Sequence, residues 1–327
     1  MRKSNRIVSI LLGILVCIAT VAIVRAELKA HSEEVKPNLK LSFSVLSDIH
    51  SGEIKLDYAI KDLHSINPRM DAMVLNGDTV DQGLDEQYGV ISRCLTLDKP
   101  FLPGRVIKTI GNHEFYNYKK GVNTPKDVEA FVSRFLAFSN EKKVYYDTWI
   151  NDYHFICLGS EKCYTPELGT VRAYISTEQQ KWLEEKLSEK YKPKKPIFIF
   201  LHQPINETVM GKNIGSNNVK AAQMSAILSK YPEAILFTSH THYSLDLPGS
   251  FIQKGFSIMN TGSVQEPLKP DGHGGDRRIG GSQGLYVEVY EDKVIIRGRE
   301  FSKKDWIDKA YFIIDLKQAI TAKKPNQ

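Results

Sequence analysis

Aspartate and histidine residues recur in five short motifs, each of which follows an apolar run of the chain. In chain order the motifs are DIH at 48–50, GDTVD at 77–81, GNHE at 111–114, LHQP at 201–204 and SHTH at 239–242. Five of the nine histidines of the chain lie in these motifs. Histidines scattered through a hydrophobic core would not collect at the ends of apolar runs, so the pattern indicates one shared site.

The residue types in these motifs are those of metal ligands. The candidate ligands are Asp48, His50, Asp78, Asn112, His202, His240 and His242. Carboxylate and imidazole together suit a borderline divalent ion such as zinc, manganese or iron. Seven ligands are too many for one tetrahedral site, but they fit two ions that share a bridging carboxylate. Because residues two apart on an extended segment face the same side, His240 and His242 can present two imidazoles from one strand end.

The segments that carry these motifs alternate between strand and helix patterns. Strands are predicted at 39–48, 71–78, 105–112, 154–160, 196–203 and 234–240, and helices at 56–67, 124–138, 176–191 and 219–231. Thr124 before Pro125 is a strong helix start, and the helix at 176–191 has the pattern of a capping box. Residues 284–301 predict a hairpin that turns at Glu291 and Asp292.

This order of elements predicts a layered α/β fold with buried strands that finishes in antiparallel β structure. Each predicted strand that precedes one of the five motifs ends at a candidate ligand or one residue after it. In α/β sheets the carboxyl ends of the strands form the edge at which ligands bind. The fold and the candidate site therefore point to the same edge.

The five motifs, in this order, resemble those of the calcineurin-like metallophosphoesterase superfamily. The resemblance spans Asp48 to His242. It implies a four-layer α/β/β/α sandwich with a dinuclear centre, whose cofactors would be two divalent metal ions (Mn, Fe or Zn). By the resemblance, one ion is held by Asp48, His50 and His242, the other by Asn112, His202 and His240, and Asp78 bridges the two.

The resemblance also implies catalytic roles for His113 and Asp81. His113 matches a histidine that contacts the phosphoryl group or the leaving oxygen, and Asp81 would orient it and support its charged form. Two ions can lower the pKa of a bound water from about 15.7 to about 7, so a metal-bound hydroxide is the expected nucleophile, and His113 would protonate the leaving group. Glu114 either contacts and supports the metal ligands without binding a metal itself, or is a solvated loop acid.

Three positions depart from relatives in the superfamily. Ser239 stands where the family usually has Gly, and we expect little effect from so small a side chain. Gln82 replaces the Arg of protein Ser/Thr phosphatases, which weakens a protein-phosphatase interpretation. Asp81 stands where purple acid phosphatases have a ferric-ligating Tyr, which argues against a purple iron centre.

These observations predict an exported enzyme that hydrolyses phosphate mono- or diesters and whose partner is a small phosphoester substrate. The alternatives are a non-catalytic binding module of the same fold and a protein phosphatase. The complete ligand set favours the enzyme over the binding module. The formal net charge is +6, and four of these positive charges lie in residues 1–26, so the remainder is too small to imply a nucleic-acid partner.

The N-terminal residues predict a targeting segment. A basic head precedes the uncharged residues 7–24, which suits either a signal peptide cleaved after Ala26 or a retained membrane anchor within 1–26. Either alternative places the rest of the chain outside the cytoplasm, because the basic flank stays inside. Residues 27–38 are predicted to be a linker, 39–316 the catalytic domain and 317–327 a polar tail.

The remaining candidate groups favour structural roles. Cysteines after the N-terminal segment number three, so no disulfide framework is implied. Cys157 is expected to be a buried thiol, and its spacing leaves a bridge to Cys163 open. His154 is expected to be structural. Arg277 and Arg278 favour a solvated loop over a phosphate-binding role.

Overall fold

The computed structural model describes residues 38–205 and 221–317. The predicted targeting segment, linker residues 27–37 and tail residues 318–327 lie outside the described residues, so the predicted domain limits and the membrane link stay predictions. The described residues from Leu39 onward belong to one compact unit. No helix within the described ranges is both long and apolar enough to cross a lipid bilayer.

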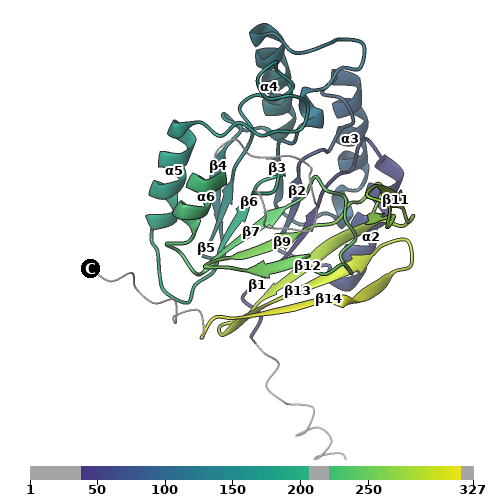
Figure 1. Cartoon of the computed structure of the whole chain (residues 1–327). Helices are drawn as coiled ribbons and strands as arrows, with labels where there is room; N and C mark the ends of the chain where they lie inside the picture. The colour runs from purple at the N-terminus through teal and green to yellow at the C-terminus, as the bar shows by residue number, and fades with distance from the viewer. Residues whose placement is uncertain (1–37, 206–220, 318–327) are drawn as a thin grey trace, which may run out of the picture. The chain divides into compact units, whose positions relative to one another are not determined.

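One sheet combines the first three strands of the unit with its last three (Figure 1). Its order is β14 (Asp305–Asp315), β13 (Lys293–Glu300), β12 (Gln283–Val289), β1 (Leu41–Leu46), β2 (Ala72–Asn76) and β3 (Val106–Thr109). β1, β2 and β3 are parallel, whereas β12, β13 and β14 pair antiparallel. The predicted hairpin at 284–301 is confirmed as β12 and β13.

The second sheet is formed by the middle of the chain. Its order is β4 (Tyr146–Ile150), β5 (Tyr153–Cys157), β6 (Ile197–Phe200), β7 (Ala234–Thr238), β9 (Ser257–Asn260) and β8 (Phe251–Gln253). The four central strands, β5, β6, β7 and β9, are parallel, and only the two edge pairs are antiparallel. A separate hairpin pairs β10 (Leu268–Pro270) with β11 (Asp276–Arg278).

Helices cover the outer faces of both sheets (Figure 1). The helices that pack on the first sheet are α2 (Glu53–Ile66), α3 (Asp85–Leu97) and α4 (Pro125–Ser139), and those on the second sheet are α5 (Thr177–Ser188) and α6 (Ala221–Leu228). Short 3₁₀ turns span Lys99–Phe101 and His113–Phe115. Three apolar clusters, one between the sheets and one beneath each helical layer, confirm the predicted four-layer α/β/β/α sandwich.

The space between the sheets is aromatic in its middle. The Phe43 ring meets Phe198 and Phe155 edge-on, with centroids 4.8 and 5.1 Å apart, and Phe200 stacks on Phe237 at 5.2 Å. All five rings are buried. Such edge-on and offset pairs contribute about 0.5–1.5 kcal/mol each beyond the area that they bury.

On five strands, the side chains that face the space between the sheets change from apolar to polar at the carboxyl end of the strand. Side chains alternate with period two along a strand, so the residue two places after an inward apolar one also faces inward. The pairs are Val45 and Ser47, Val74 and Asn76, Phe200 and His202, Phe237 and Ser239, and Met259 and Thr261. The polar members are all buried, and they lie at the carboxyl ends of parallel strands.

The two predicted helix starts differ in detail. At α4 the Thr124 hydroxyl accepts from Asp127 N, and Asp127 in turn accepts from Thr124 N at 3.1 Å, so the cap is reciprocal. At α5 the Ser176 hydroxyl accepts from Gln179 N at 3.1 Å. The predicted capping box is wrong there, because the Gln179 amide instead pairs with both backbone groups of Gly159.

The fold also bears on the expectations for the arginine loop, the cysteines and His154. Residues 276–278 form the strand β11 rather than a loop, and Arg278 Nε lies 3.0 Å from Glu266 Oε1. The described cysteines are free and buried, so Cys157 and Cys163 do not form a bridge. The structural role expected for His154 is confirmed, since its buried ring stacks on Trp149 at 4.1 Å.

Candidate metal centre

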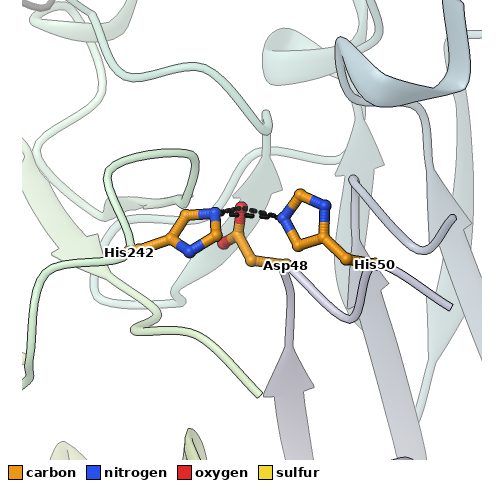
Figure 2. Close-up of side chains that lie close together, drawn as sticks. All are labelled: Asp48, His50 and His242. Atoms are coloured by element: carbon orange, nitrogen blue, oxygen red, sulfur yellow. Dashed lines mark hydrogen bonds and ion pairs between the residues drawn. The ribbon is translucent and has the colours of Figure 1, made fainter. Parts of the chain in front are cut away.

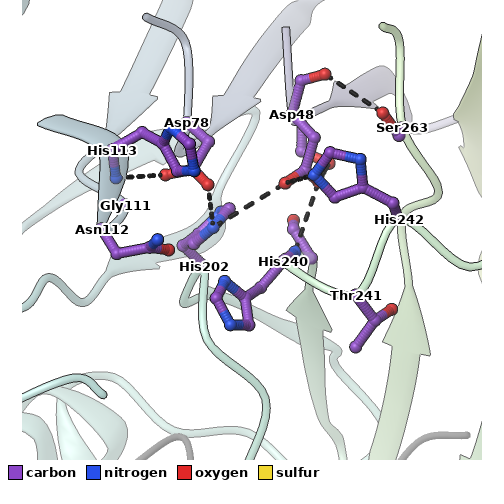
Figure 3. Close-up of polar contacts among 12 residues, drawn as sticks. Asp48, Asp78, Gly111, Asn112, His113, His202, His240, Thr241, His242 and Ser263 are labelled. Atoms are coloured by element: carbon purple, nitrogen blue, oxygen red, sulfur yellow. Dashed lines mark hydrogen bonds and ion pairs between the residues drawn. The ribbon is translucent and has the colours of Figure 1, made fainter. Parts of the chain in front are cut away.

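The nine predicted site residues come together at the carboxyl ends of five parallel strands from both sheets. Asp48 and His50 follow β1, Asp78 and Asp81 follow β2, Asn112 and His113 follow β3, His202 follows β6, and His240 and His242 follow β7. Figure 3 shows most of these side chains converging on one region. The strand edges therefore position the site as the sequence pattern predicts.

The first group of ligand atoms joins Asp48, His50 and His242 (Figure 2). The three atoms lie within 4.8 Å of one another. His242 Nε2 is 3.2 Å from Asp48 Oδ1, and it lies 3.0 Å from His50 Nε2. Two imidazole nitrogens and a carboxylate oxygen that converge in this way can coordinate one cation.

The second group joins Asp78, His202 and His240, again within 4.8 Å. His202 Nε2 is 3.0 Å from Asp78 Oδ2 and 3.8 Å from Asp48 Oδ1, so the two groups are adjacent. Asn112 lies beside the second group (Figure 3). A further set of convergent atoms links Asp78 with His50 from the first group, as expected of a residue between two ions.

Unpartnered buried atoms provide a test of whether these residues fit metal ions. Asp48 Oδ1, Asn112 Oδ1 and His202 Nε2 are all buried and have no hydrogen-bond partner among the described residues. A buried polar atom without a partner costs about 1–3 kcal/mol. Each of these atoms carries a lone pair that a cation could accept, and one belongs to each predicted ligand type. The residues present therefore fit a pair of divalent ions.

The opposite ring nitrogens of two histidines are held by backbone carbonyls. His202 Nδ1 donates to Asn76 O at 2.9 Å, and His242 Nδ1 donates to Glu266 O at 3.2 Å. A carbonyl can only accept, so the proton resides on Nδ1 and the Nε2 lone pair remains available for a metal. This arrangement of supporting groups is typical of metal-binding histidines.

The backbone is strained where the ligands leave the strands. Positive φ angles occur at Asp48 (50°), His50 (46°), Asp78 (47°), His240 (72°) and His242 (56°). A left-handed conformation costs a non-glycine residue about 1–3 kcal/mol and persists only where the surroundings enforce it. Five of the seven candidate ligands share this strain. The expectation that His240 and His242 face one side because their segment is extended is wrong, since left-handed turns direct both side chains instead.

Glu114 helps to hold the strained backbone in place through hydrogen bonds to backbone amides. Its carboxylate is fully buried and accepts from Gly111 N at 2.7 Å, Thr79 N at 2.8 Å and Asp78 N at 3.1 Å. Burial, followed by the neighbouring Asp78 charge, raises the pKa of Glu114 to about 7. Glu114 therefore ties the loops after β2 and β3 together, and the alternative of a solvated loop acid is wrong.

Asp48 is held by groups that motif spacing did not reveal. Ser47 Oγ donates to its Oδ2 at 2.8 Å, and His240 N donates to the same oxygen at 3.3 Å. Ser263 Oγ donates to the Asp48 carbonyl at 3.2 Å (Figure 3). Burial would raise the pKa of Asp48, but the imidazoles of His242 and His202 outweigh it and lower this pKa to about 2.

His113 and Asp81 are adjacent, as the resemblance implied. His113 Nδ1 donates to the backbone carbonyl of Asp81 at 2.9 Å and lies 3.4 Å from the carboxylate. The same carboxylate accepts from Tyr118 Oη at 3.0 Å and lies 3.6 Å from His50 Nδ1. Burial opposes the charged form of His113, but Asp78 and Asp81 outweigh it and raise its pKa to about 9.

Tyr116 is a further supporting residue that the sequence patterns did not indicate. Its hydroxyl accepts from Asn112 Nδ2 at 2.9 Å and donates to Thr170 O at 2.7 Å. Because the carbonyl of Thr170 takes the hydroxyl proton, only the NH₂ end of Asn112 can bond to this oxygen. Tyr116 therefore sets the orientation in which Asn112 Oδ1 is left unpartnered.

Comparison with known proteins agrees with this geometry. A family model described as calcineurin-like phosphoesterase matches residues 41–244, more than half of the chain. A curated protein from Arcobacter nitrofigilis, named probable glycerophosphodiester phosphodiesterase GpdQ, is 23% identical over 212 residues, which are 64% of this chain and 68% of that protein.

Two solved structures share the fold at low identity. A dimetal phosphatase from Danio rerio superposes with a TM-score of 0.59 at 15% identity, over 85% of this chain and all of that one. The purple acid phosphatase PPD1 from yellow lupin superposes with a TM-score of 0.56 at 13% identity, over 84% of this chain and 53% of that one. The chain thus belongs to the calcineurin-like phosphoesterase family, which uses a dinuclear metal centre, and it is a metal-dependent phosphoric ester hydrolase.

Proposed function

We propose that this protein hydrolyses small phosphate mono- or diesters at a centre of two divalent ions (Mn, Fe or Zn). The observation that carries the proposal is the pair of adjacent ligand groups, Asp48 with His50 and His242, and Asp78 with His202 and His240. Their unpartnered atoms are buried at one sheet edge, where two cations would complete them. When bound, the ions would supply a water of lowered pKa and positive charge beside the phosphoryl oxygens.

The chain's own residues then orient the reacting groups. Asp78 directs Oδ2 toward His202 while its Oδ1 accepts from His113 N at 2.9 Å, so one carboxylate connects the ligands to the backbone of His113. The bond from His113 Nδ1 to Asp81 O leaves Nε2 as the ring nitrogen that can meet the ester. We infer that His113 Nε2 delivers a proton to the leaving oxygen and that Asp81 holds the ring in place.

A phosphodiester is the first substrate class to test. Support comes from the Arcobacter relative, whose name describes a glycerophosphodiester phosphodiesterase. Both ester classes need the same in-line displacement between two ions, so the ligand geometry supports them equally. Glycerophosphodiesters and simple monoesters are therefore the two arms of a substrate panel.

The experiment is hydrolysis by purified protein loaded separately with Mn²⁺, Zn²⁺ or Fe²⁺. Bis(p-nitrophenyl) phosphate, p-nitrophenyl phosphate and a glycerophosphodiester would be compared, with Asp48→Asn as the ligand-deficient control. We expect turnover that requires metal and is lost in Asp48→Asn. Stoichiometric metal binding without hydrolysis of any ester would instead identify a non-catalytic binding module.

We also propose that the enzyme works outside the cytoplasm. The support is the sequence of residues 1–26, where a basic head precedes the uncharged run 7–24. The test is a reporter that works only in the cytoplasm, fused after Gln327. Activity of this reporter would contradict the proposed location. The cleaved and the retained forms would be distinguished by the N-terminal sequence of the mature protein.

A further inference from the structure

A continuous chain of polar side chains lies between the aromatic core and the metal ligands. Its members are fully buried, and they follow or end strands of both sheets: Thr109, Asn76, Ser239, Thr261 and Ser47. We call this set the polar chain. Its last member, Ser47, donates to Asp48 Oδ2.

Each link in the polar chain is a short hydrogen bond. Thr109 Oγ1 donates to Asn76 Oδ1 at 2.9 Å, and Asn76 Nδ2 donates to Ser239 Oγ at 2.8 Å. Ser239 Oγ and Thr261 Oγ1 are 2.7 Å apart, and Thr261 Oγ1 and Ser47 Oγ are 2.8 Å apart.

The two ends determine the direction of the bonds. An amide NH₂ can only donate, so Ser239 accepts from Asn76. At the other end an ionised carboxylate can only accept, so Ser47 donates to Asp48 Oδ2 at 2.8 Å. Ser47 Oγ also donates to the Gly262 carbonyl at 3.0 Å, so two acceptors compete for its single proton, and Asp48 Oδ2 is the nearer and the charged one. With that proton on Asp48, the bonds run from Asn76 through Ser239, Thr261 and Ser47 to Asp48.

Both metal-ligand groups contact members of this chain, the first through a side chain and the second through a backbone carbonyl. Asp48 of the first group receives the terminal bond, and His202 of the second group donates from Nδ1 to the backbone carbonyl of Asn76. The polar chain also crosses between the sheets, since Ser47 and Asn76 belong to the first sheet and Ser239 and Thr261 to the second. A shift of one sheet against the other would stretch these bonds and move Asp48 relative to His202.

Resting on the proposed two-metal function, we propose that the polar chain, with Ser239 at its centre, is a positioning device that holds Asp48 and His202 at metal-binding distance. Loss of the Ser239 hydroxyl would remove the link between Asn76 and Thr261. This proposal differs from the expectation of little effect at Ser239, and the variants below distinguish the two. Hydrogen bonds that end on a charged group are stronger than neutral ones, and linked bonds polarise one another.

Four single variants separate the hydroxyl bonds from packing. Ser239→Ala and Thr261→Val each remove one hydroxyl from the polar chain, whereas Thr261→Ser keeps the hydroxyl and removes only a methyl group. Thr238→Val is the matched control, because Thr238 is also fully buried next to Ser239 but its Oγ1 has no hydrogen-bond partner among the described residues.

The measurement is Mn²⁺ affinity, by isothermal titration calorimetry on full-length protein stripped with a chelator. We expect Ser239→Ala and Thr261→Val to weaken Mn²⁺ binding by about 10–100-fold, the usual size for residues that support a ligand. Thr261→Ser and Thr238→Val should stay within about 2-fold of the unmodified protein. Thermal unfolding of the metal-free variants would confirm that each one is folded, and activity of the first two should return at saturating Mn²⁺.

Two results would overturn the inference. One is wild-type Mn²⁺ affinity in both Ser239→Ala and Thr261→Val. The other is equal weakening in Thr261→Ser and Thr261→Val, which would attribute the effect to packing. Absence of Mn²⁺ binding by the unmodified protein is a different outcome, because it would remove the proposed two-metal function on which the inference rests.

Discussion

Two buried regions share the space between the sheets, and they differ in how their side chains find contacts and hydrogen-bond partners. Around Phe43, rings fill the space and need only contact with one another. One layer nearer the carboxyl ends, Asp48 and His202 are equally buried, yet each keeps an atom without a hydrogen-bond partner among the described residues. The first region gains free energy from apolar burial alone, whereas the second is completed only when a cation supplies the missing contact.

This difference indicates that the metal site is built into the interior of the sandwich. The change occurs within two residues on the same strands, as from Phe200 to His202 and from Phe237 to Ser239. Because the ligands are held before a metal arrives, its binding should add to the stability of the folded chain. The two regions should therefore respond differently to mutation, one through stability and the other through metal affinity and turnover.

The largest effect is expected from Asp78→Asn. A neutral amide cannot balance the charge of two cations, and several kcal/mol of the barrier reduction depend on those ions. We expect kcat/KM to fall by more than about 10⁴-fold on every substrate, together with loss of bound metal, measured by elemental analysis. Asp85→Asn, on the exposed start of α3, is the control. Full metal retention by Asp78→Asn would refute its bridging role.

The next effect, from His113→Ala, depends on the leaving group. An alkoxide needs a proton as it departs and a nitrophenolate does not, so loss of a general acid should cost about 10²–10⁴-fold on alkyl esters. Activity on nitrophenyl esters and the metal content should change little. Equal losses of kcat on alkyl and aryl substrates would mean that His113 binds the phosphoryl oxygens instead.

In the apolar region, Phe43→Ala should act on stability. Truncation of a buried phenylalanine usually costs about 3–5 kcal/mol of unfolding free energy, to be measured by urea denaturation in chelator. Molecules that remain folded should bind Mn²⁺ with unchanged affinity. Tyr311→Ala, at a side chain that is 52% exposed, should cost less than about 0.5 kcal/mol. A large loss of Mn²⁺ affinity in folded Phe43→Ala would show that the two regions are not separable.

The smallest effect is expected from Tyr116→Phe. Without the hydroxyl, the Asn112 amide can rotate and direct its NH₂ group toward the ligands, so we expect about 10-fold weaker Mn²⁺ binding, at the lower end for a supporting residue. Tyr118→Phe is the control, since that hydroxyl donates to Asp81 rather than to a predicted ligand. Identical titration curves for Tyr116→Phe and the unmodified protein would remove this role.

Two elements of the fold, β9 and α3, could not be predicted from the sequence, and the reasons are local. β9 has only two apolar residues, Ile258 and Met259, so it lacks the continuous apolar run that marks β6, a strand of the same length. α3 contains Gly89 near its middle, and glycine lowers helix propensity by about 1 kcal/mol relative to alanine. Because β9 was not predicted, Thr261 and Ser263 were not expected near the site. Their hydroxyls contact Ser47 and the Asp48 carbonyl, respectively.

The sequence alone predicted which residues gather at the candidate site and that they lie at the carboxyl ends of the strands. Ligand types are chemical properties of single residues, and their placement after apolar runs is a local pattern that puts them at the carboxyl ends of the strands. Their direction could not be predicted in the same way, because left-handed backbone angles at Asp48 and His240 interrupt the strand alternation. Asp48, Asp78 and His202 could therefore be identified from residue type and position along the chain.

Only the tertiary structure decided which atoms support those residues. Ser47 and Thr261 are 214 positions apart, and Asn76 and Ser239 are 163 apart, yet each pair is within hydrogen-bond distance. Serine, threonine and asparagine are common in many surroundings, so nothing in their spacing marks these four as partners. Their contacts exist because the two sheets pack face to face with their parallel strands ending at one level, and that registration is a property of the packed sandwich rather than of any segment within it.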